Sequence, residues 1–169
     1  MKVTGYKLRE AIKEQELRRD TAARAFDGSL KKFAGEDKET PQAITDAFLA
    51  AETKVARLQT VQMRYNLAVE VSVGSDRMTL AEAIKRVGGT ARVEKMWRSV
   101  AGPKPDRYAM RGDDSRDDDK IYAAPTVTTK EAMKAASAAA KRAGEYRAAI
   151  ATGNATAVDF ENLDPALFE

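Results

Sequence analysis

The chain has 169 residues, of which 29 are Lys or Arg and 26 are Asp or Glu, so its formal net charge is only +3. It contains no cysteine and no histidine, which excludes disulfides, catalysis by thiolate or imidazole, and zinc sites built from these side chains. Basic and acidic residues alternate along the chain instead of gathering on one segment. Nucleic acid is therefore not expected as a partner.

Residues 4–33 are predicted to form the first helix. Apolar side chains recur along it at steps of three and four, and Gln15 and Arg19 fill two positions of the same row. Arg19 is either a buried cation that binds a ligand or a device that fixes the register of two helices, and we favour the second reading. The short polar loop 35–40 predicts an antiparallel hairpin with the next helix.

The longest helical pattern runs from Thr40 to Val71. Thr40 suits the N-cap, and Pro41 suits the first helical position. A single apolar stripe, interrupted only by Gln62, contains Ile44, Phe48, Ala51, Val55, Leu58, Tyr65 and Val69. So long a helix with an apolar stripe is not stable alone in water, so the rest of the chain is expected to pack around it.

A turn at 72–76 precedes the third helix, which opens with a capping box at Thr79–Glu82. Gly88 and Gly89 lie in its middle, where two glycines cost about 2 kcal/mol relative to alanine. Either the helix breaks there or a neighbouring backbone approaches it closely.

Residues 107–124 are predicted to form a β-hairpin with a charged tip. A lone two-stranded hairpin is marginally stable in water, and its edges can pair with other strands. We therefore predict that hairpins of different copies meet through Tyr108, Met110, Ile121 and Tyr122.

The fourth helix is predicted from Thr128 to Ala151, with a capping box at Thr128–Glu131 and Gly153–Asn154 as its stop. The remaining tail carries four acidic residues and no basic one. It either frays or docks on a bundle, and it could also bind another protein.

The predicted fold is thus mainly α, with four long helices in a bundle of antiparallel hairpins and a small β-hairpin between the third and fourth. Residues 1–158 are expected to form a single domain, followed by an acidic tail at 159–169. No apolar run reaches the length of a membrane span, and the N-terminus lacks the apolar middle of a signal peptide. We expect a cytoplasmic protein, or one exported without such a signal, and no membrane partner.

Several short motifs follow one another in an order that resembles the septicolysin-like family of small helical proteins. They are Thr79-Leu80-Ala81-Glu82-Ala83-Ile84, then Lys120-Ile121-Tyr122-Ala123-Ala124-Pro125-Thr126-Val127, then Asn154-Ala155-Thr156. The resemblance spans most of residues 5–158, and the chain departs from it at Gly88–Gly89, at Ala155 and in its acidic tail. It implies a helical fold with an inserted hairpin and, through the family's name, a cytolysin; it carries over no catalytic residue.

Three functions compete on this basis. The first is a non-enzymatic helical scaffold or interaction protein that binds copies of itself, without cofactor or metal, and it is the one we favour because no catalytic constellation is present. The second is a membrane-active cytolysin of the septicolysin type. The third is an accessory protein that associates with nucleic acid or a virion through basic residues of the first and fourth helices.

Overall fold

The computed structural model describes residues 1–101 and 126–168. Four helices dominate these residues, and two small antiparallel sheets of two strands each accompany them, which confirms the predicted mainly α fold. The predicted hairpin 107–124 lies outside the described residues, together with Tyr108, Met110, Ile121 and Tyr122.

The chain divides into two compact units. Residues Met1–Ala83 and Ala149–Glu169 make up the first unit, and Ile84–Ala148 make up the second. The prediction of a single domain over residues 1–158 stays a prediction.

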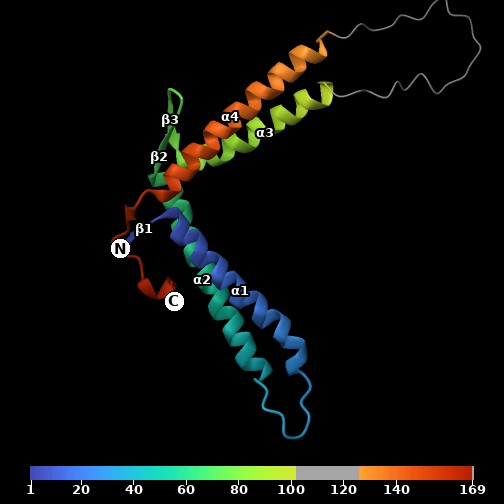
Figure 1. The fold of residues 1–169 in the computed structure, drawn as a ribbon. Coiled ribbons are helices and arrows are strands. Elements are labelled where there is room, and N and C mark those ends of the chain that lie inside the picture. The colour runs from blue at the N-terminus through green and yellow to red at the C-terminus, as the bar shows by residue number, and fades with distance from the viewer. Residues whose placement is uncertain (102–125, 169) are drawn as a thin grey trace, which may run out of the picture. The chain divides into compact units, whose positions relative to one another are not determined.

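Helices α1 (Gly5–Ser29) and α2 (Pro41–Ala68) form a hairpin in the first unit (Figure 1). Both begin at an N-cap threonine: the Thr4 hydroxyl accepts the Lys7 N–H and the Thr40 hydroxyl accepts the Ala43 N–H, each at 3.2 Å. The predicted stripe of α2 is buried at Ile44, Ala51, Val55, Leu58 and Tyr65.

Helix α1 ends four residues before the predicted end at residue 33. The Ser29 hydroxyl donates to the Phe26 carbonyl at 2.6 Å, a local bond that competes with helical continuation. Phe33 lies beyond the end and is 74% exposed. The predicted boundary was wrong because the apolar spacing continued into residues that find no partner on α2.

Helix α2 ends at Ala68, so the predicted helical end at Val71 was also wrong. Strands β2 (Glu70–Val73) and β3 (Asp76–Thr79) follow, in antiparallel register with Val71 opposite Met78. Their two-residue loop begins at Gly74, whose φ of +62° is one that glycine adopts without strain. Val71, Val73 and Met78 are buried, so one face of this hairpin is packed against the rest of the first unit.

Helix α3 (Leu80–Ala101) begins as predicted, with the Glu82 N–H donating to the Thr79 hydroxyl at 3.2 Å. It runs unbroken through Gly88 and Gly89. A Cβ built on Gly89 meets nothing within 4 Å. The two glycines therefore neither break the helix nor make room for a close neighbour among the described residues.

Helix α4 (Thr129–Ala155) buries one stripe of mostly small side chains. Its members follow steps of three and four: Ala132, Ala136, Ala139, Ala143 and Tyr146. The predicted stop at Gly153–Asn154 was wrong, because both residues are buried inside the first unit and the helix continues through them.

The two ends of the described chain meet in the first unit. Strand β1 (Lys2–Val3) pairs antiparallel with β4 (Val158–Asp159), and the Phe160 N–H donates to the Met1 carbonyl at 3.1 Å. A short 3₁₀ helix, η1 (Pro165–Phe168), buries Leu167 and contacts α2. Of the two alternatives for the acidic tail, the structure has the docked one.

The start of α4 provides a first prediction. Thr128 and Glu131 form a reciprocal cap: the Glu131 N–H donates to the Thr128 hydroxyl at 3.2 Å, and the Thr128 N–H donates to the Glu131 carboxylate at 2.9 Å. Thr128→Ala should lower the free energy of unfolding by about 1 kcal/mol, measured by urea denaturation. Thr129→Ala is the control and should lower the free energy of unfolding by less. Equal losses of free energy for the two variants would contradict the assignment of Thr128 as the N-cap of α4.

Candidate functional site: a helical interaction surface

The three polar residues that the sequence places in the seam of the first two helices occupy different environments. Gln15 is only 2% exposed and belongs to the buried face of α1. Arg19 and Gln62 are half-buried. Arg19 and Gln62 therefore lie at the edge of the seam. Gln15 lies in its interior and is the one buried polar residue among the described residues of α1 and α2.

Arg19 forms ion pairs with two neighbouring carboxylates. Its guanidinium lies 3.0 Å from the Asp20 carboxylate and 3.2 Å from Glu52 on α2. The pKa of Arg19 is raised above its ordinary value, mostly by the hydrogen bond to Asp20 and next by the hydrogen bond to Glu52. This geometry ties α1 to α2 and agrees with the register reading of Arg19 rather than with a ligand site.

A second polar cluster lies at the junction where α1 begins and α2 and α4 end. The Tyr65 hydroxyl lies 2.7 Å from both the Gly153 and the Thr156 carbonyls, and its ring lies close to Gly5 at the start of α1. Burial raises the pKa of Tyr65, which keeps the hydroxyl protonated. Tyr65 is thus a hydrogen-bond donor that joins the end of α2 to the end of α4.

A polar surface lies next to this junction. A small groove beside it is lined by Glu70, Val71, Ser72, Ala149, Thr152, Gly153 and Thr156. Glu70, its one ionisable residue, is paired with Arg77. In residues 1–101 and 126–168, no group of three acidic side chains is placed to hold a metal ion.

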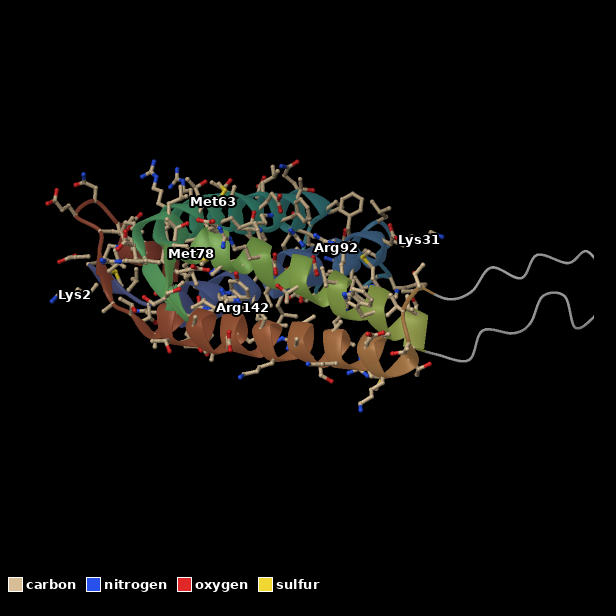
Figure 2. The ribbon with its side chains drawn as sticks, turned by 90° about the horizontal axis from the view of Figure 1, so that it is seen from above. Lys2, Lys31, Met63, Met78, Arg92 and Arg142 are labelled. Atoms are coloured by element: carbon tan, nitrogen blue, oxygen red, sulfur yellow. The ribbon has the colours of Figure 1, made fainter. Side chains whose placement is uncertain are left out.

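The most distinctive feature is a second row of residues on α2, which we call the outer row. It starts five positions after the buried stripe, and each step is again three or four: Leu49, Thr53, Ala56, Thr60, Met63 and Leu67. Five residues turn an α-helix by about 140°, so the outer row lies on the side of α2 away from the stripe that packs on α1. Figure 2 shows Met63 pointing away from the ribbon.

All six residues of the outer row are exposed. Leu49, Met63 and Leu67 keep 55%, 61% and 64% of their surface in contact with solvent. Large apolar side chains scattered singly over a surface are common, whereas these three lie in one row at the spacing of coiled-coil positions.

The far end of the α1–α2 hairpin is also apolar and open. A groove of about 300 Å³ is lined by Ala22, Ala23, Phe26, Ile44, Thr45 and Phe48. Leu30 and Phe33, just beyond α1, are exposed as well. The hairpin is therefore well packed near the junction and incompletely covered at its tip.

Sequence reasoning found the inner stripe of α2 and missed the outer row. The signal was present, because the spacing of the outer row is as regular as that of the inner stripe. It was masked by Thr53 and Thr60, which count as polar although a threonine on a helix can turn its hydroxyl back to the backbone.

The chain matches no known family model. No curated protein matches it either. Its fold is similar to the crystal structure of a functionally unknown conserved protein from Corynebacterium diphtheriae, with a TM-score of 0.66 and 20% sequence identity. The alignment covers 94% of this chain and 100% of that one. This likeness shows that the fold recurs in another protein; it says nothing about activity.

Proposed function

We propose that this protein is a non-enzymatic helical scaffold that assembles with copies of itself. The observation that supports the proposal is the outer row of α2, a surface of uncharged, partly apolar residues with coiled-coil spacing that is exposed in the first unit. The ion pairs of Arg19 and the protonated state of Tyr65 agree with structural roles for the polar groups that lie nearest to this hairpin.

Burial of apolar side chains is the free-energy term that would drive association. Complete burial of one leucine- or methionine-sized side chain contributes about 1.5–3 kcal/mol. Each copy has three such side chains in the outer row, all more than half exposed. Their burial offsets part of the loss of translational and rotational freedom on binding, and the tip of the hairpin offers further apolar surface.

The test is the mass of the purified full chain in solution, measured by light scattering and by sedimentation equilibrium over a wide range of concentrations. We expect a mass well above 18.5 kDa that falls on dilution. A mass of 18.5 kDa at every concentration would overturn the proposal.

A membrane-active role is the second candidate, and the resemblance to septicolysin is what favours it. None of the helices in the described part of the chain combines the length and apolarity that a bilayer crossing requires. The outer row could instead lie against lipid in the plane of the interface. Release of a trapped dye from liposomes would support this role, and intact liposomes over a range of neutral and anionic lipids would exclude it.

A further inference from the structure

We propose that the second unit binds the phosphate backbone of duplex DNA through a row of lysines on α4. The inference goes beyond the proposed self-assembly and does not depend on it. It begins from the way charge is divided between the two units. The first unit carries 14 basic and 17 acidic residues, whereas the described residues of the second unit, 84–101 and 126–148, carry ten basic and three acidic ones. The net charge of +3 for the whole chain hides this separation.

Helices α3 and α4 share the basic residues of the second unit equally. On α3 they are Lys85, Arg86, Arg92, Lys95 and Arg98. On α4 they are Lys130, Lys134, Lys141, Arg142 and Arg147. All except Arg142 are exposed. The sequence of residues 102–125 contains five basic and six acidic residues and therefore leaves the positive excess of the unit nearly unchanged. By contrast, α1 carries six basic and five acidic residues and has no such excess.

The acidic side chains of the second unit are engaged at their own helices. Glu94 forms an ion pair with Arg98 at 2.9 Å, and Glu145 forms one with Arg142 at 3.0 Å. The Glu131 carboxylate accepts the backbone N–H that precedes α4 and so belongs to the helix cap. These three carboxylates cannot balance ten cations, so the positive excess is available to a partner outside the chain.

Three lysines of α4 form a straight row, which we call the lysine row: Lys130, Lys134 and Lys141. Each lies two positions from a member of the buried stripe, as Lys134 does from Ala132 and Lys141 from Ala139. Two residues turn an α-helix by about 200°, so the row lies on the side of α4 opposite the stripe. All three side chains are exposed, and none forms an ion pair within the described residues.

A straight row of lysines suits a partner with evenly spaced phosphates. The row extends over about 16 Å, and each strand of duplex DNA carries one phosphate per about 3.4 Å of helix axis. It therefore runs past about five phosphates of one strand. The ammonium group of lysine is a compact point charge that binds phosphate oxygens without reading the base sequence. We expect binding that is sensitive to salt and insensitive to DNA sequence.

The surroundings of the lysine row disfavour two other anionic partners. Single-stranded nucleic acid is bound by stacking on exposed aromatic rings, and the one aromatic residue of α4, Tyr146, is buried. A helix that lies on anionic lipid carries bulky apolar side chains beside its basic ones, whereas Ser137 and Ala138 fill the gap between Lys134 and Lys141. Duplex DNA is the polyanion that this row fits best.

Fluorescence anisotropy of a labelled DNA duplex of about 24 base pairs, titrated with the full chain, tests the proposal. Affinity should fall steeply between about 50 mM and about 200 mM salt and should be the same for two unrelated sequences. Replacing the whole lysine row by glutamine should weaken binding about tenfold or more and reduce the salt slope by about three, one for each lysine. Glutamine keeps a helix propensity close to that of lysine.

The matched control replaces Lys13, Lys31 and Lys32 of the first unit by glutamine. These lysines are also exposed, and the control loses the same net charge as the lysine-row variant. It should keep the salt slope of the parent chain and its affinity within about threefold. Far-UV circular dichroism should be the same for all three chains. If the triple variant loses helicity, Lys134→Gln alone serves in its place and should reduce the slope by about one.

Four results would overturn the proposal. The first is a parent chain that does not bind the duplex at about 50 mM salt. The second is an equal loss of affinity in both variants, which would mean that net charge alone attracts the DNA. The third is tighter binding to the corresponding single strand. The fourth is binding to phosphatidylserine vesicles without binding to DNA. A chain that binds DNA as a monomer would support this inference while overturning the scaffold, so the two fail separately.

Discussion

Replacing Tyr65 by Phe is expected to lower the free energy of unfolding by about 1–3 kcal/mol, although the ring stays in place. The side chain has no solvent exposure, and its hydroxyl lies within hydrogen-bond distance of the Gly153 and Thr156 carbonyls at the end of α4. Without the hydroxyl, the Thr156 carbonyl loses this donor, and the Gly153 carbonyl keeps the bond from the Thr156 N–H at 3.1 Å. Urea denaturation of parent and variant measures the difference.

The neighbouring Tyr6 is the matched control. Its hydroxyl donates to the Ala151 carbonyl at 3.2 Å, but its side chain is partly exposed and water can replace the lost bond. Tyr6→Phe should therefore cost less than about 1 kcal/mol. Equal costs for the two substitutions would show that the buried junction holds the helix ends together by packing alone.

The same tyrosine gives the stability a pH dependence. Burial raises the pKa of Tyr65 above its ordinary value of 10.0, so the unfolded chain loses the proton first as the pH rises. The contribution of Tyr65 to the free energy of unfolding is fully present below pH 10.0. It is lost as the pH rises through the raised pKa that Tyr65 has in the folded protein. The gap in stability between parent and Tyr65→Phe should narrow in this range, and a constant gap would contradict a protonated, buried hydroxyl.

Local patterns were sufficient to predict the four helices of this chain. Apolar spacing predicted which face of α2 is buried, and the caps at Thr40, Thr79 and Thr128 lie where the sequence places them. Each of these features depends on residues within one or two helical turns, so the sequence contains all the information they need.

The end of α2 was misread because one residue belongs to two patterns. Val69 lies four positions after Tyr65, as a helix requires, and it also begins the alternation Val69, Val71, Val73 that a half-buried strand shows. Gly74 and the pairing with β3 favour the strand, and such pairing involves residues beyond the local window.

The end of α4 was misread for the opposite reason, because a local stop signal yields to tertiary packing. Gly153 usually ends a helix, but here a Cβ on it would stand 2.7 Å from a Val71 methyl and 3.1 Å from a Leu80 methyl. Because glycine has no side chain, α4 can lie close to β2 and to the start of α3, both of which are distant in sequence. The Tyr65 junction was likewise invisible in advance, since it joins residues 5, 65 and 153.

Replacing Gly5 by Ala is expected to be the most disruptive small substitution in the first unit. A Cβ at this position would overlap the Asn154 Oδ1 and would lie 2.8 Å from the Tyr65 ring and 3.1 Å from the Asn154 Cα. Asn154 is 2% exposed and Tyr65 is fully buried, so neither can move aside without disturbing the junction. Overpacking of this kind costs about 1–3 kcal/mol and sometimes more.

Gly144 provides the matched control for this substitution. It lies in the interior of α4, it is exposed, and a Cβ built on it meets nothing within 4 Å. Gly144→Ala should therefore raise the free energy of unfolding by up to about 1 kcal/mol, because alanine restricts the unfolded chain and favours the helix. Thermal and urea denaturation of the two variants should give changes of opposite sign. If Gly5→Ala also stabilises the protein, the helix ends do not meet as closely as the junction requires, and the role assigned to Tyr65 fails with it.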